Sequence, residues 1–152
     1  MDILPKDAFF KLLEDKKIAV VGSSPITVPD ASTQIDNSDI VIRINNFNNY
    51  HLPNTGTKVD IILQTFTENW KRYPDERKNL PAIKKHHPLI CCIKEPDKFD
   101  NYCKELFKDI ATVKYVPYTF FRKVEYTTGT IALIGLATYL KNADVKVFGF
   151  EP

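Results

Sequence analysis

Residues 17–24 read KIAVVGSS, an apolar run that ends in a glycine and two serines. The run is rich in apolar residues without polar alternation, which is typical of a parallel strand buried on both faces. A glycine directly after such a strand permits close approach of the backbone to a ligand, and open α/β sheets bind ligands at this edge. Taken alone, the stretch is also compatible with an ordinary structural turn.

Similar apolar runs recur along the chain, with helical or loop segments between them. We expect strands at Ile18–Val21, Ile40–Ile44, Val59–Leu63, Leu89–Ile93, Thr112–Val116 and Val145–Phe150. Helices are expected at Pro5–Asp15, around Pro74–His86, at Asp97–Lys108 and at Gly129–Leu140. Two prolines predict that the stretch from Ser23 to Asp39 is a loop with at most one short turn. The expected fold is α/β and Rossmann-like, with a mostly parallel sheet of about six strands and helices on both faces.

The composition predicts one globular domain over residues 1–152. The chain is 43% hydrophobic and 26% charged, and its length suffices to bury one core without disulfides or a metal. A net charge of +2 without a basic stripe argues against a nucleic-acid partner. The sequence has no apolar run long enough for a membrane span and no signal-peptide pattern, so we expect a soluble, cytoplasmic protein. The cysteines lack metal-ligand spacing and are expected to be reduced thiols: Cys91, Cys92 and Cys103.

Polar residues interrupt and follow the second predicted strand. Arg43 lies within an apolar run, where a charge must find a partner or reach the strand's end, so it is either a structural ion pair or an anion partner. Asn45 and Asn46 follow at the carboxyl edge of the sheet. An amide there can bind a base, ribose or phosphate, although asparagine is also a common turn residue.

A third polar segment, residues 122–130, reads RKVEYTTGT and precedes the most apolar predicted helix. Thr127 or Thr128 is a natural N-cap, and the exposed amides of a first helical turn favour a carboxylate or phosphate. Arg122 is a second candidate anion partner. Capping alone would explain one of the two threonines.

Together these segments resemble the sialyltransferases, namely the animal-type family 29 and the bacterial family 42 of glycosyltransferases. Residues 17–24, 42–46 (IRINN) and 56–58 (GTK) look like the long sialyl motif. Residues 127–129 (TTG) and 147–150 (VFGF) look like the short sialyl motif. The resemblance implies that Ser23 and Asn45 contact the nucleotide of CMP-sialic acid, and that Thr127, Thr128 and Gly129 hold its phosphate or sugar carboxylate. We expect the donor-binding site to include Gly22, Ser24 and Asn46 as well.

The chain departs from the family pattern in two respects that bear on catalysis and binding. Ser23 stands where the family usually has asparagine, which shortens the reach of a hydrogen bond. The family's general-base histidine follows the short motif, yet the 23 residues after Gly129 include no histidine. His51, in the loop after the second strand, is therefore the one local candidate for an acid or base, since His86 and His87 precede the fourth strand and are expected at the surface.

The sequence thus predicts a sialyltransferase-like domain that binds a CMP-sugar donor for transfer to a glycan acceptor. No metal is expected, because no Asp-x-Asp or carboxylate pair follows a strand. The alternative is a catalytically silent nucleotide-binding or interaction module that retains the fold. We expect a glycosyltransferase without the family's usual catalytic histidine, either the nucleotide-binding core of a longer enzyme or a reduced relative that has lost the acceptor and base region.

Overall fold

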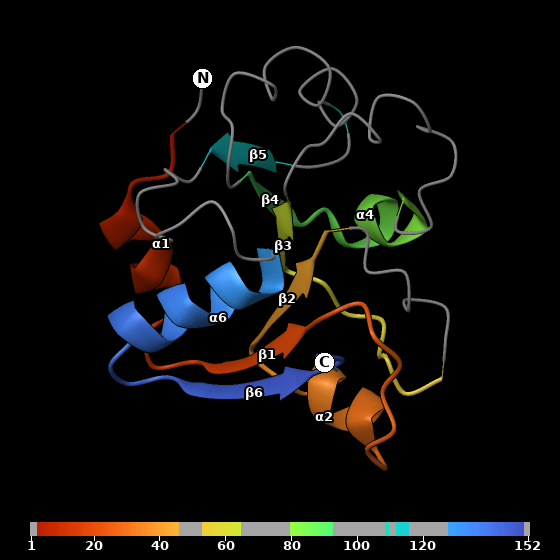
Figure 1. Ribbon diagram of the computed structural model, residues 1–152. Helices are drawn as coiled ribbons and strands as arrows, with labels where there is room; N and C mark the ends of the chain where they lie inside the picture. Colours follow the sequence, from red (N-terminus) through yellow and green to blue (C-terminus); the bar gives the residue numbers. More distant parts are fainter. Residues whose placement is uncertain are drawn as a thin grey trace.

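Six strands form one sheet at the centre of the protein, and every neighbouring pair of strands is parallel. The structure, a computed structural model, describes residues 3–45, 53–64, 80–92, 109, 112–115 and 128–150. The strands are β1 Lys17–Val21, β2 Ile40–Ile44, β3 Ile61–Gln64, β4 Leu89–Cys92, β5 Thr112–Tyr115 and β6 Asp144–Phe148. Their order across the sheet is β5-β4-β3-β2-β1-β6 (Figure 1).

The order of the strands creates a switch point beside β1. From β1 to β5 the chain adds each strand on the same side, and β6 then returns to the opposite side of β1. Connections on the two sides of such a point leave from opposite faces of the sheet, which opens a crevice at the carboxyl ends of the strands. In this protein the change of direction lies between β1 and β6, where Val21 is in register with Phe148.

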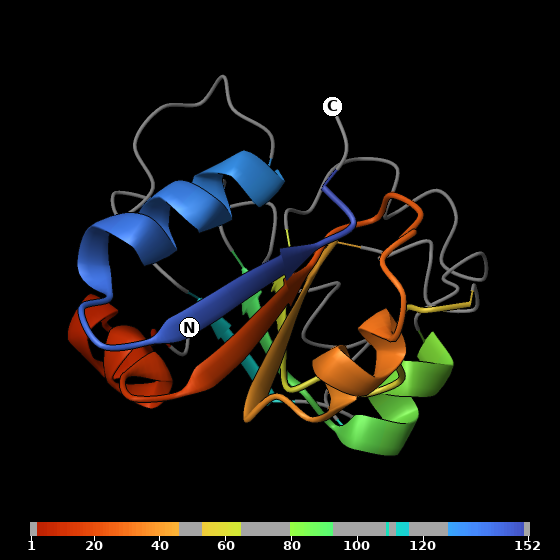
Figure 2. The ribbon, with the colours of Figure 1, turned by 90° about the horizontal axis from the view of Figure 1, so that it is seen from below.

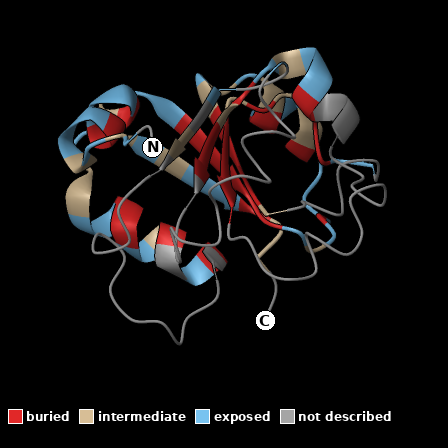
Figure 3. Ribbon diagram, turned by 90° about the horizontal axis from the view of Figure 1, so that it is seen from above, coloured by how far each residue is buried: buried red, intermediate tan, exposed pale blue. Residues whose placement is uncertain are grey.

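Helices α1 (Lys6–Leu13) and α6 (Thr128–Tyr139) cover one face of the sheet (Figure 2). The apolar side chains of these two helices meet alternate residues of the central strands in one buried cluster. Figure 3 marks the buried positions of the strands and helices in red. The alternation follows from the period of two in a strand, which sends successive side chains to opposite faces. Ala132 and Leu136 of α6 are buried here, while Ile134 on its outer side is 43% exposed.

Helices α2 (Ala31–Asp36) and α4 (Leu80–His86) lie on the other face. The prediction of a loop from Ser23 to Asp39 was wrong in its middle, because α2 connects β1 to β2. Ala31 and Ile35, one helical turn apart, are buried against Val21 and Val41. Pro29 precedes the helix and so does not interrupt it, and burial of two apolar residues suffices to hold this short segment helical.

The expected α/β, Rossmann-like class with helices on both faces is confirmed, and the strands fall close to their predicted positions. β6 ends at Phe148 instead of Phe150, because Gly149 has a φ of 70°, which is incompatible with an extended strand. β3 begins at Ile61 instead of Val59. The predicted helix at 97–108, and the predicted ends of the fourth and fifth strands at Ile93 and Val116, lie outside the described residues.

Across the described ranges, no helix combines the length and apolar character that crossing a membrane requires.

Candidate functional site

The carboxyl ends of β1 and β6 are joined closely at the switch point. The backbone N–H of Gly22 donates to the carbonyl oxygen of Phe148 at 2.8 Å, and that of Ser24 donates to Gly149 at 3.0 Å. Gly22 is buried, and a Cβ on it would overlap the carbonyl oxygen of Gly149. Close contact between two backbones therefore accounts for the glycine without any ligand. Of the serines that follow, Ser23 is exposed and Ser24 half-buried, so Ser23 faces the solvent at this edge.

The N-terminus of α6 lies at the same edge. Gly129, the second residue of the helix, is buried, and a Cβ on it would come within 2.5 Å of Cε1 of Phe150, just beyond β6. The start of α6 is thereby placed next to the end of β6, with its first-turn amides at the carboxyl edge, where a helix of this length favours an anion. Thr128 begins the helix, whereas Thr127 and Arg122 lie outside the described residues.

Asn45 directly follows β2, the strand next to β1, at the same edge of the sheet. Its backbone has a φ of 53°, in the left-handed region, which asparagine tolerates better than most residues. The Asn45 N–H donates to the carbonyl oxygen of Leu63 at 2.9 Å, so β3 holds this residue in line with the sheet. Its side chain is half-buried and accepts a hydrogen bond at Oδ1 from Nε2 of Gln64, at 3.3 Å. Asn46, the next predicted site residue, lies outside the described residues.

Gln64 is a site residue that the sequence analysis missed. It ends β3, is 1% exposed, and is one of three polar or charged residues in the described part of the chain that are buried. The predicted third strand ends at Leu63, one residue before Gln64. The signal that could have found it is an amide directly after Ile61-Ile62-Leu63, at the same edge of the sheet as Asn45.

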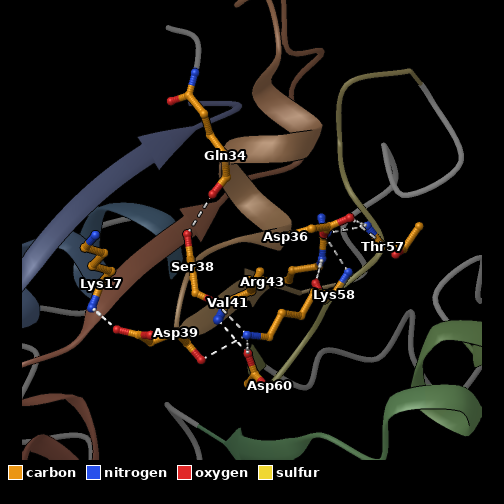
Figure 4. A network of polar contacts seen from close by, with 10 residues as sticks. All are labelled: Lys17, Gln34, Asp36, Ser38, Asp39, Val41, Arg43, Thr57, Lys58 and Asp60. Atoms are coloured by element: carbon orange, nitrogen blue, oxygen red, sulfur yellow. Dashed lines mark hydrogen bonds and ion pairs between the residues drawn. The ribbon is translucent and has the colours of Figure 1, made fainter.

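Arg43 is fully buried, and its contacts favour the structural alternative. Its Nε donates to the carbonyl oxygen of Lys58 at 3.0 Å and its Nη2 to that of Thr55 at 2.8 Å. Figure 4 shows the guanidinium directed from β2 toward the segment that leads into β3. These two partners are neutral carbonyl groups, so Nε and Nη2 of Arg43 fasten a loop to the sheet.

The segment 53–60, which includes the Gly56-Thr57-Lys58 part of the long motif, is also held by Asp36 at the end of α2. The Asp36 carboxylate accepts hydrogen bonds from the backbone N–H of Thr57 at 2.9 Å and of Lys58 at 3.0 Å (Figure 4). Gly56 has a φ of 66°, and a Cβ there would come 2.5 Å from Asp36 Oδ1. This part of the motif therefore closes a tight turn against α2, away from the strand ends that carry Asn45 and Gly22.

Neither of the two described histidines lies at the carboxyl edge of the sheet. His51 lies outside the described residues. His87 is exposed, as expected, but His86 is half-buried at the end of α4, before β4 begins, and this corrects its expected surface position. Burial lowers the pKa of His86, and the neighbouring Lys85 lowers it further. Both residues precede β4, so they belong to the amino edge of the sheet.

Cys91, the cysteine whose side chain the structure describes, is a buried free thiol in β4. Burial raises its pKa, which keeps the thiol protonated and unreactive. Among the described residues, no group of three or more histidine, cysteine, aspartate or glutamate side chains could hold a metal ion. The described edge of the sheet therefore offers hydroxyl groups, amides and a helix terminus as its binding chemistry.

In sum, the described site residues form a row along one edge. Gln64, Asn45, Gly22 and Gly149 end or follow β3, β2, β1 and β6, which are neighbours in that order, and the N-terminus of α6 lies beside Phe150. Comparison with protein-family models gives no match, and a search of the curated proteins finds no similar sequence. The sialyltransferase-type interpretation rests on the motifs themselves and on this placement.

Proposed function

We propose that this domain binds a cytidine nucleotide sugar of the CMP-sialic acid type and forms the donor-binding part of a sialyltransferase-like glycosyltransferase. The observation that carries the proposal is the meeting of the two sialyl-like motifs. The long motif provides the end of β1 and the short motif provides the start of α6 and the end of β6, and these elements are in contact at the switch point. Ligands of open α/β sheets bind at such points.

The proposed roles follow from the chemistry of each element. The first turn of α6 would receive the phosphate or the sugar carboxylate, because its amides and the helix dipole favour negative charge. Ser23, Ser24 and Asn45 would bind the nucleotide through hydroxyl and amide groups. Transfer to a glycan acceptor needs a base, and His51 is the candidate for that role.

A second candidate is a catalytically silent module that retains the fold, and one set of contacts favours it. The glycines at 22 and 129 are both accounted for by packing against Gly149 and Phe150. Arg43 is engaged with backbone carbonyls. Several motif residues would thus be kept by the fold alone, even without a ligand.

A thermal-shift screen with CMP, CDP, UMP, AMP and GDP separates the two candidates. A ligand that binds only the folded state at 100 times its Kd stabilises by about 2.7 kcal/mol, which for a domain of this size raises Tm by roughly 5–10 °C. We expect CMP to give the largest shift. The absence of a shift with all five nucleotides would reject donor binding and leave the silent module.

If CMP binds, catalysis is tested by following CMP release from CMP-sialic acid with and without a lactose-type acceptor. Release that depends on the acceptor and disappears in His51→Ala would assign the base to His51. Unchanged transfer in His51→Ala would dismiss that residue, whereas binding without turnover would identify a silent nucleotide-binding domain.

A further inference from the structure

A buried glutamine at the end of an apolar strand is an unusual choice of residue. Gln64 follows Ile61, Ile62 and Leu63, which are all buried, and is itself 1% exposed. Burying an amide costs free energy unless hydrogen bonds compensate, so the contacts of this amide decide what it does here. The place of Gln64, at the carboxyl edge, indicates that its polar group has a task there.

The described partner of this amide is Asn45, which belongs to the proposed donor site. Ile44 is in register with Leu63, so the next residues along each strand, Asn45 and Gln64, lie side by side. Nε2 of Gln64 donates to Oδ1 of Asn45 at 3.3 Å, while the backbone of Asn45 is fixed by its hydrogen bond to Leu63. The backbone and the side chain of Asn45 are thus each held by β3.

We propose that Gln64 is a positioning residue of the donor site, which sets the orientation of the Asn45 side-chain amide for contact with the nucleotide. This inference rests on the proposed function. Gln64 acts through Asn45, and we assign it no direct contact with the nucleotide. A preset amide does not have to be ordered when the ligand binds, so the pair raises nucleotide affinity by preorganisation.

The first test replaces Gln64 with methionine, which has a similar length and no amide. CMP affinity of Gln64→Met should fall about tenfold by calorimetry, the usual scale for one lost hydrogen-bond partner. In an Asn45→Ala background the same substitution should have no further effect, because the residue through which it acts is gone. Ile62→Val, on the same strand, controls for general loosening of β3 and should leave the affinity unchanged.

The second test uses Gln64→Glu, whose effect should depend on pH. A protonated glutamate can donate to Asn45 Oδ1 as glutamine does, whereas the ionised form can only accept. Burial raises the pKa of such a carboxyl group. The ratio of the CMP affinity of Gln64→Glu to that of the unmodified protein should therefore be near one at low pH and fall as the pH rises. The ratio at each pH cancels titration of the CMP phosphate, and melting curves without ligand confirm that each variant is folded.

The outcomes separate this inference from the proposed function. If the unmodified protein does not bind CMP, both fall together. If the unmodified protein binds CMP and Gln64→Met binds it equally well, the positioning role alone is overturned. The same holds if Gln64→Met lowers CMP affinity by the same factor in the Asn45→Ala background as in the unmodified protein. A relative affinity of Gln64→Glu that is constant with pH would overturn it as well, because loss of the donated proton would then leave the Asn45 amide unaffected.

Discussion

Replacing Arg43 with methionine tests whether this cation fastens a loop or binds an anion. The guanidinium is fully buried and donates to the carbonyl oxygens of Thr55 and Lys58. Methionine fills much of the same space with an apolar chain and makes neither bond. If the role is structural, Arg43→Met should lower the free energy of unfolding. The molecules that remain folded should bind CMP with unchanged affinity.

The magnitude follows from the two hydrogen bonds. Each bond from a charged donor contributes about 1.5–3 kcal/mol, so their loss costs roughly 3–6 kcal/mol. Part of this is regained, because the variant no longer buries a cation and adds apolar packing. We expect a net decrease of about 2–4 kcal/mol in the free energy of unfolding. For a domain of this size the corresponding fall in Tm is roughly 4–16 °C.

The assay is urea unfolding combined with CMP titration below the melting range, with Arg43→Lys as the matched control. Lysine keeps the charge, but its single ammonium group lacks the planar fork that reaches both carbonyls, so it should also destabilise. An anion partner would behave differently, with lysine preserving much of the affinity for CMP. Unchanged unfolding in Arg43→Met together with lost CMP binding would refute the structural assignment.

Three further predictions concern packing, protonation and thiol reactivity. Gly129→Ala should destabilise the protein by about 1–3 kcal/mol, because the new Cβ displaces the ring of Phe150. In a Phe150→Leu background the same change should be neutral or stabilising, since alanine is the better helix former. Thermal melts of the unmodified protein, the two single variants and the double variant decide this. Stability should decrease more steeply below pH 6.5 in the unmodified protein than in His86→Gln, because the lowered pKa of His86 makes protonation favour unfolding; His87→Gln is the exposed control, and parallel pH profiles would contradict the prediction. Cys91 should resist alkylation until the protein unfolds, as peptide mass spectrometry can show, and rapid labelling of the native protein would exclude its burial.

The parts of the fold that were predictable are those in which local pattern and tertiary packing agree. β2 falls at its predicted bounds, since a run of buried β-branched residues fits only a strand covered on both faces. α2 was missed because it depends on tertiary contacts. Its six residues contain polar side chains typical of loops, and burial of Ala31 and Ile35 against the sheet overrides that local tendency.

That the described candidate residues lie at one edge of the sheet was predictable, and their contacts were less so. Strand ends and a helix start come to the same edge, because topology alone brings those segments together. The role of Arg43 could not be read from the sequence, since its acceptors are backbone carbonyls of a loop, and any residue type supplies such groups. Gln64 was missed because the strand was ended one residue early and the pairing with Asn45 depends on the register between β2 and β3.

The contacts of the motif residues show which of them are evidence for a bound ligand. Gly22 and Gly129 are required by neighbouring atoms of the fold itself, so their presence would persist in a protein that binds nothing. Asn45 and Gln64 are different, because their side-chain amides are hydrogen-bonded to each other at the edge where we propose that the nucleotide binds. The pair Asn45 and Gln64, more than the glycines of either motif, is therefore the place where nucleotide binding should be tested first.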